Sequence, residues 1–237
     1  GAAAADQYVL YRGADVIPVP GAHCGNDDTG KPAEGAPPSN IAAWFLRAQI
    51  AYDADSNYYI LNGRSIPNTE ADIQAINNAV NAVYEREARI THLVTTIIVR
   101  TPVGLGEVEP YTSTNAETLL NEFKSEWNQN RQSVARDVAH LMTGKNLDGA
   151  TIGVAWLGTV CASVTNGQGY GLSQSRFSTN FSLRMVLTAH ELGHNWNAPH
   201  CNQVSPPQNP CGIMCSAVDG CGQNQFFEPY SLGIIYA

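Results

Sequence analysis

The chain has 237 residues, of which 43% are apolar and 14% are charged, and its formal net charge is −8. This length and apolar content are sufficient for one sizeable hydrophobic core, or for one domain divided by a cleft. The negative charge argues against nucleic acid or an anionic membrane as the main partner. No run approaches the roughly 18 apolar residues that a bilayer crossing needs. We therefore expect no nucleic-acid binding and no membrane span.

Residues 1–46 are predicted to form an extended N-terminal arm, the remnant of a propeptide or a linker. Proline and glycine recur along this stretch, and no helical or strand-like period is sustained in it. We expect the folded domain over residues 47–237.

The apolar pattern of residues 47–144 predicts alternating strands and helices. Ile73, Ile76 and Val80 recur at helical spacing, whereas residues 89–101 are rich in the β-branched side chains typical of a strand. In chain order we expect a strand over 47–61, a helix over 69–88 capped by Asn68 or Thr69, a strand over 89–101, a helix over 117–133 and a short helical segment over 136–144.

The second half of the chain predicts two strands, over 149–160 and 170–175, followed by a helix over 180–196. Beyond this helix the sequence is rich in proline, glycine and cysteine and has little regular pattern. The order of elements indicates an α/β fold with a mostly parallel sheet. A larger upper part, up to about residue 196, and a small irregular lower part, over about 197–237, should meet at the last helix.

Six cysteines are present, and four of them gather near the C-terminal end. They are Cys24, Cys161, Cys201, Cys211, Cys215 and Cys221. An even number without a CxxC pair favours disulfides, and hence an oxidising, extracellular compartment, over a second zinc site. The pairing itself stays open.

Residues 190–200 read HELGHNWNAPH and predict a metal site. Because helix positions four apart share a face, His190 and His194 can offer imidazole nitrogens to one zinc ion. Glu191 lies beside this pair, where it can take a proton from a metal-bound water and later deliver it to a leaving amine. A catalytic zinc needs a third protein ligand and one open position, and His200 is the natural candidate.

The third histidine can reach the ion only if the chain turns sharply after about Trp196. Such a turn favours a positive φ, which glycine adopts freely and asparagine tolerates next best. We therefore expect Asn197 to preserve the turn, and Pro199 prevents the helix from continuing. His23, His92 and His140 follow no such spacing. We do not expect His92 and His140 to be ligands, whereas the role of His23, next to Cys24, stays open.

The sequence of residues 190–200 resembles the zinc signature HExxHxxGxxH of the metzincin metallopeptidases, with Asn197 in place of glycine. Met214, in CGIMCS, matches the methionine turn of that clan. From about residue 47 onward the chain is most similar to the adamalysin, or reprolysin, family. Ser216 stands where astacins and serralysins usually have tyrosine, and Cys201 departs from the aspartate usual in adamalysins, so a disulfide from Cys201 is expected to replace that support.

The resemblance implies a metzincin-like fold: a twisted sheet with helices above, a small disulfide-containing part below, and an active-site cleft between them. It implies one catalytic zinc on His190, His194 and His200, Glu191 as general base and acid, and Met214 beneath the site. It also implies that an extended substrate pairs with an edge strand, Ile152, Gly153, Val154, Ala155 and Trp156. Calcium is possible but not favoured: Asp137 matches a calcium ligand, but Gln49 replaces the expected glutamate.

Cys24 has two interpretations. As a thiolate on the arm it could ligate the zinc and keep a zymogen latent; alternatively it could form a disulfide, for example with Cys161, which the even cysteine count favours.

The sequence thus predicts a secreted, monomeric zinc endopeptidase acting on proteins or peptides. A catalytically inactive or latent metzincin-fold binding domain, and a zinc hydrolase of small substrates, are the alternatives. Retention of Glu191 and all three histidines argues against an inactive copy.

Overall fold

The computed structural model describes part of the arm and most of the chain after it. The described residues are 23–24, 45–102, 107–161, 168–218, 220–221 and 225–236, with residues 23–24 described by their backbone. Most of the arm expected over residues 1–46 therefore lies outside the described residues.

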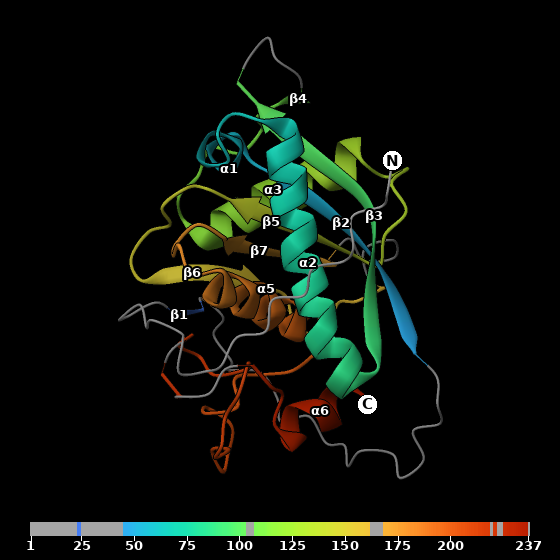
Figure 1. Cartoon of the computed structure of the whole chain (residues 1–237), viewed down its shortest axis with the longest axis vertical. Helices are drawn as coiled ribbons and strands as arrows, with labels where there is room; N and C mark the ends of the chain where they lie inside the picture. Colours follow the sequence, from blue (N-terminus) through green and yellow to red (C-terminus); the bar gives the residue numbers. More distant parts are fainter. Residues whose placement is uncertain are drawn as a thin grey trace, which may run out of the picture.

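Strands and helices alternate along the chain, as the sequence pattern predicts (Figure 1). The strands are β1 (His23–Cys24), β2 (Leu46–Ala54), β3 (Ile90–Thr101), β4 (Glu107–Val108), β5 (Val138–Thr143), β6 (Thr151–Ala155) and β7 (Tyr170–Gln174). The helices are α1 (Ser56–Leu61), α2 (Ile66–Ala88), α3 (Ala116–Asn130), α5 (Phe181–Asn195) and α6 (Pro229–Ile235).

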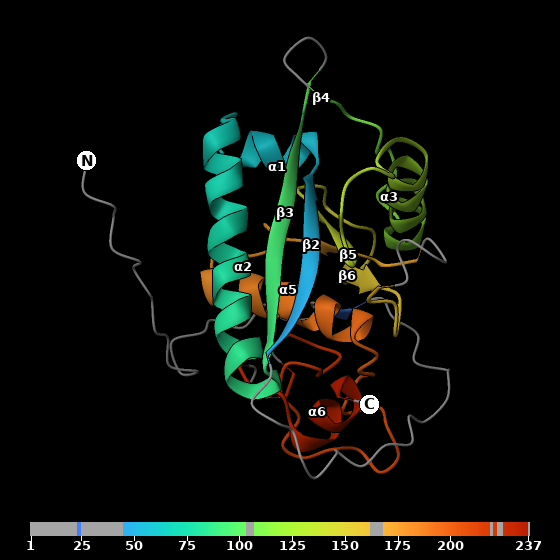
Figure 2. The same cartoon turned by 90° about the vertical axis from the view of Figure 1, so that its right-hand side faces the viewer.

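The strands form one sheet in the order β1-β6-β7-β5-β2-β3-β4. Every neighbouring pair is parallel except β6 and β7, which are antiparallel. Helices α2 and α5 cover one face of the sheet, and α3 covers the other (Figure 2). The predicted α/β class with a mostly parallel sheet is confirmed.

Two hydrophobic clusters fill the two sides of the sheet. The larger one joins α2, α5 and the buried cysteines and methionine of the lower part, including Met214. The smaller one surrounds Phe123 and Trp127 of α3. Because the larger cluster continues from α5 into the lower part, the metal-site helix is held from above and below by one apolar core.

The strand expected over residues 47–61 ends earlier, at Ala54. The Asp55 carboxylate accepts a hydrogen bond from the Tyr58 backbone N–H, at 2.7 Å, and so caps α1. The same carboxylate also accepts from the Gly144 N–H at 2.9 Å. This long-range contact fixes Asp55 at the point where β2 ends and α1 begins. The propensities of the neighbouring residues alone do not predict this change from strand to helix.

The prediction of a short helical segment over residues 136–144 was wrong. Residues 138–143 of this segment form β5, which lies between β2 and β7 and is buried along its whole length. A short apolar run has the same composition in a buried strand as in a buried helix, so tertiary pairing decided between them. The expected cap of the helix over 69–88 was also wrong: Ser65, not Asn68 or Thr69, caps α2, and its side chain accepts from the Asn68 N–H.

The lower part is irregular apart from α6, and two disulfides cross-link it. These are Cys201–Cys211 and Cys215–Cys221. The expected disulfide from Cys201 is therefore present. Cys161 remains a free, exposed thiol, so the suggested pairing of Cys24 with Cys161 is not formed. Among the described helices, none has the length and apolar content that a bilayer crossing requires.

Candidate metal centre

Helix α5 carries the first two histidines of the site. It begins after Asn180, whose side chain accepts from the Ser182 N–H, and ends at Asn195. His190 and His194 lie one turn apart and are 2% and 0% exposed. The helix runs beneath β6 and β7 of the sheet (Figures 1 and 2). Residues 182–195 of this helix are buried, which explains why most of its side chains are small or apolar.

Three imidazole nitrogens converge on one point. The Nε2 atom of His190 is 3.0 Å from that of His194 and 3.2 Å from that of His200. In a tetrahedral zinc site, bonds of about 2.0–2.1 Å place two ligand nitrogens roughly 3.3 Å apart. The spacing of the three nitrogens therefore fits a shared zinc ion, and His200 lies with the other two although it is outside the helix.

The other ring nitrogen of each histidine has an oxygen partner. His190 Nδ1 lies 2.7 Å from the Ile213 carbonyl oxygen, His194 Nδ1 lies 2.8 Å from that of Ala198, and His200 Nδ1 lies 3.1 Å from Gln203 Oε1. Each acceptor favours a proton on Nδ1 and leaves the Nε2 lone pair directed at the common point. Burial, with the neighbouring histidines, also lowers the pKa of His194 well below its ordinary value, which keeps its imidazole neutral.

The turn that brings in His200 depends on Asn197, as predicted. Asn197 has a φ of 75°, in the left-handed region. The turn is closed by hydrogen bonds from the Asn197 N–H to the His194 carbonyl oxygen, at 2.8 Å, and from the Ala198 N–H to that of Gly193, at 2.9 Å. Gly158 packs against the Asn197 side chain, since a Cβ there would lie 2.8 Å from Asn197 Oδ1. Asparagine thus takes the place that glycine has in the family signature.

Two substitutions at Asn197 should separate backbone strain from side-chain packing. Asn197→Ala is expected to lower the free energy of unfolding by about 1 kcal/mol, because alanine tolerates positive φ less well than asparagine. Asn197→Gly should stay within about 1 kcal/mol of the wild type. Chemical denaturation of the zinc-loaded proteins measures both. An alanine variant as stable as the wild type would contradict this account of the turn.

Glu191 is fully buried and lies against the backbone of β6. A Cβ built on Gly153 would be 2.3 Å from Glu191 Oε1. Only a residue without a side chain therefore leaves room for this carboxylate between the helix and the sheet. The sequence identified Glu191, but no local signal identified Gly153 as its neighbour.

Met214 lies beneath the helix and is fully buried. A Cβ on Gly193 would be 2.3 Å from Met214 Sδ, so the methionine packs directly against the helix backbone between the two histidines. The Met214 carbonyl oxygen accepts from the Cys201 N–H at 2.9 Å. This contact joins the methionine to the residue that follows His200.

Asn195 is a positioning residue that sequence reasoning missed. Its Nδ2 donates to the carbonyl oxygens of Trp156 and Tyr170, at 3.0 and 3.1 Å, and contacts Thr159 Oγ1 at 3.1 Å. The end of α5 is thereby tied to β7 and to the residue that follows β6. Its type and place in the sequence do not distinguish it from a surface asparagine.

The histidines that follow no spacing pattern lie apart from this group. Burial lowers the pKa of His92 and of His140 to about 3, so both are neutral. His92 Nε2 accepts from Trp196 Nε1 at 3.1 Å, and His140 Nε2 lies 2.8 Å from Ser173 Oγ. Neither belongs to the described groups of residues that converge as metal ligands. The side chain of His23 lies outside the described residues.

Four of the five residues expected at the substrate edge, Ile152–Ala155, lie in β6, and Trp156 follows it directly. The Trp156 N–H donates to the Tyr170 carbonyl oxygen, so its backbone is directed toward β7. By the alternation of a strand, the backbone groups of Gly153 and Ala155 are directed to the other side. On that side β1 pairs in parallel with β6, with His23 opposite Thr151 and Cys24 opposite Gly153.

Asp137, the possible calcium ligand, makes protein contacts. Its Oδ2 accepts from the Gln49 N–H at 2.7 Å, and its Oδ1 lies 3.6 Å from Cys161 Sγ. Both carboxylate oxygens therefore serve to join β2 to the residues that precede β5 and follow β6.

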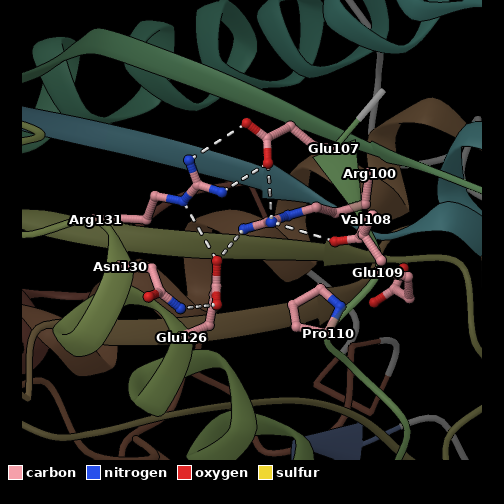
Figure 3. Close-up of a pocket in the computed structure, with 8 residues that line it drawn as sticks. All are labelled: Arg100, Glu107, Val108, Glu109, Pro110, Glu126, Asn130 and Arg131. Atoms are coloured by element: carbon pink, nitrogen blue, oxygen red, sulfur yellow. Dashed lines mark hydrogen bonds and ion pairs between the residues drawn. The ribbon is translucent and has the colours of Figure 1, made fainter. Parts of the chain in front are cut away.

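A hollow of about 690 Å³ lies between β4 and the end of α3, away from the histidines (Figure 3). Four of its charged groups form ion pairs: Glu126 contacts Arg100 at 3.1 Å and Arg131 at 3.3 Å, and Glu107 contacts Arg131 at 2.7 Å. Arg100 is also bonded to the buried Asp53. This paired network stabilises the fold, and the Glu109 carboxylate beside it accepts hydrogen bonds from the Ser56 and Tyr111 backbone N–H groups.

The mixed sheet, the helix with two histidines beneath it, the turn to a third histidine and the methionine below define a metzincin-type metallopeptidase. A reprolysin model described as metallo-peptidase family M12 matches residues 47–227. The chain belongs to this family.

The chain is similar to curated relatives over part of their length. It is 24% identical over 169 residues to the zinc metalloproteinase-disintegrin-like brevilysin H2a of Gloydius brevicauda, covering 71% of this chain and 38% of that protein. It is 36% identical over 94 residues to a zinc metalloproteinase/disintegrin of Bitis gabonica, covering 39% and 27%. The chain thus matches well under half the length of either relative.

A solved structure described as a chaperone-substrate complex contains a chain with a similar fold. The TM-score is 0.57 at 11% identity, covering 81% of this chain and 34% of that one. This likeness supports the fold alone.

Proposed function

We propose that this chain is a secreted zinc-dependent endopeptidase that hydrolyses peptide bonds in protein or peptide substrates. The observation that carries the proposal is the convergence of the His190, His194 and His200 Nε2 atoms at zinc-ligand spacing, with Glu191 next in sequence to the first ligand. The two disulfides support an oxidising, extracellular location.

His190, His194 and His200 would hold the ion. When bound, zinc polarises a peptide carbonyl and lowers the pKa of a water molecule toward about 7. Glu191 would act as the general base that takes a proton from the attacking water and as the general acid that then delivers it to the leaving amine. Its buried place between α5 and Gly153 supports this role, because the carboxylate is held without being exposed to bulk solvent.

The edge of β6 would align the substrate. The outward backbone groups of Gly153 and Ala155 can pair with an extended peptide, and such main-chain pairing accepts many sequences. Pairing of this kind favours internal cleavage of long chains over hydrolysis of small molecules.

Removal of the metal tests the proposal. The zinc-loaded protein is expected to cleave casein and an internally quenched peptide, and a chelator should abolish both activities. Added zinc should restore them. Mass spectrometry of the products should locate cleavage at internal peptide bonds. A zinc-loaded, folded protein that cleaves neither substrate would contradict the proposal, unless it is latent.

Latency is a specific alternative, because β1 pairs with the strand that a substrate would use. We propose that β1 blocks this edge and that the Cys24 thiolate acts as the latency ligand. The register supports this, since Cys24 lies opposite Gly153, the residue in contact with Glu191. A latent chain of this kind would bind its own arm in place of substrate.

Cys24→Ala is expected to raise peptide cleavage by the unprocessed chain, because the variant lacks the thiolate that would compete with water for the ion. Activity measured before any proteolytic trimming decides the matter. Cys161→Ala, which removes the free thiol far along the chain, is the matched control and should leave activity unchanged. Equal latency in the Cys24 variant and the wild type would exclude a thiolate switch.

A further inference from the structure

A lysine lies over the aromatic residue that follows the substrate edge. Lys124 Nζ of α3 is 5.1 Å from the centroid of the Trp156 ring, at a distance typical of a cation–π contact. No ion pair within the described residues includes Lys124. Its neighbours one turn away along α3 carry no carboxylate; they are Leu120, Asn121, Trp127 and Asn128. Its positive charge is thus available to a ligand.

Trp156 is held firmly at the end of β6. Its N–H donates to Tyr170, and its carbonyl oxygen accepts from Asn195 Nδ2 and from Thr159 Oγ1. The indole also packs edge-on against the Tyr170 ring, with centroids 6.2 Å apart. Both Trp156 and Lys124 are half-buried, so the ammonium group has a defined position beside the sheet edge.

The side chains along β6 alternate between the two faces of the sheet, and Trp156 and Lys124 lie on the face opposite the histidines. Gly153 is directed toward Glu191 and hence toward α5. Val154 belongs to the cluster around α3, and Trp156, two residues on, packs against the same cluster. A peptide added to this edge would direct its side chains alternately toward the histidines and toward the α3 face, where Lys124 lies.

The distance along β6 between Gly153 and Trp156 indicates which substrate residue would lie near Lys124. Trp156 is three residues from Gly153, or about 10 Å along an extended strand. Gly153 lies beside Glu191. In the proposed function Glu191 acts at the scissile bond, so Gly153 lies level with that bond. We propose that Lys124, fixed over Trp156, makes the enzyme prefer an acidic side chain, Asp or Glu, about three residues to one side of the scissile bond. This inference rests on the proposed endopeptidase function.

The test is a set of quenched peptides that share one neutral sequence. Each carries a single Glu, Gln or Lys at one of the four positions on either side of the cleaved bond. For the wild type we expect kcat/KM to be roughly three- to tenfold higher with Glu than with Lys at one position near the third residue. The preference should shrink in about 0.5 M salt, because screening weakens an exposed charge pair.

Variants of Lys124 assign the preference to this side chain. Lys124→Glu should reverse it, and Lys124→Arg should retain it. Arg47→Glu, an equal charge reversal at an exposed site at the start of β2, is the control and should leave the preference unchanged. Thermal unfolding and cleavage of the neutral peptide verify that each variant is folded and active.

Equal kcat/KM for the Glu and Lys peptides at every position would overturn the inference while the proposed function stands. A preference that survives in Lys124→Glu would overturn it too. If neither the wild type nor the Cys24→Ala protein cleaves a peptide, the proposed function fails instead. Dissociation constants of the Glu and Lys peptides for zinc-loaded Glu191→Ala protein then decide the inference, since equal binding would overturn it and tighter binding of the Glu peptide would support it.

Discussion

Glu191→Gln is expected to lower kcat for peptide cleavage by about 10³-fold, within the roughly 10²–10⁴-fold range of general acid–base catalysis. Glutamine fills the same buried space next to Gly153 but cannot take up a proton. The zinc content should be unchanged, because the three histidine nitrogens and their oxygen partners stay in place.

The measurement is steady-state cleavage of a quenched peptide, together with the zinc content of the purified protein. Glu117→Gln, which removes an exposed carboxylate from α3, is the matched control and should keep full activity. A Glu191→Gln protein that binds zinc and retains more than roughly a tenth of the activity would exclude Glu191 as the proton carrier.

Gly153→Ala is expected to lower activity by about 10–100-fold while the protein remains folded, because a misplacement of about 1 Å costs on this order. The added methyl group would lie 2.3 Å from Glu191 Oε1 and 2.8 Å from Glu191 Cδ. The end of a side chain can move, so the carboxylate should be displaced. The backbone of β6 should stay in place and the zinc should be retained.

Two comparisons make this prediction specific. Gly171→Ala adds a methyl group on β7 that contacts Ala155 and Asn195 rather than Glu191, so its loss of activity should be the smaller. Gly193→Ala directs a methyl group at the fully buried Met214, and it should lower the free energy of unfolding by about 1–3 kcal/mol through overpacking. Full activity in Gly153→Ala would show that Glu191 does not depend on this glycine.

Local spacing predicted the centre of the site. His190 and His194 share a helix face because they are four residues apart, and Asn197 tolerates the positive φ that turns the chain toward His200. These relations span fewer than a dozen residues, and short-range geometry limits them to few arrangements. The strand over 89–101 and the helix over 180–196 were predicted for the same reason, since their periods are long and regular.

Elements whose local pattern is ambiguous were predicted less well. Residues 138–143 are mostly apolar, which suits a buried helix as well as a buried strand, and their place between two other strands made them a strand. Residues 56–61 became a helix because Asp55 caps it and also binds Gly144, 89 positions along the chain. Such long-range partners leave no trace in a short window of sequence.

The convergence of the three histidines and the turn that completes it follow from the order of residues 190–200 alone, because each depends on helix geometry or on the φ preference of one residue. The packing of Gly153 against Glu191, the hydrogen bonds of Asn195, the pairing of β1 with β6 and the position of Lys124 over Trp156 were decided by the tertiary structure. Each of these contacts joins residues that are far apart in the chain, and only the packed sheet and helices bring them together.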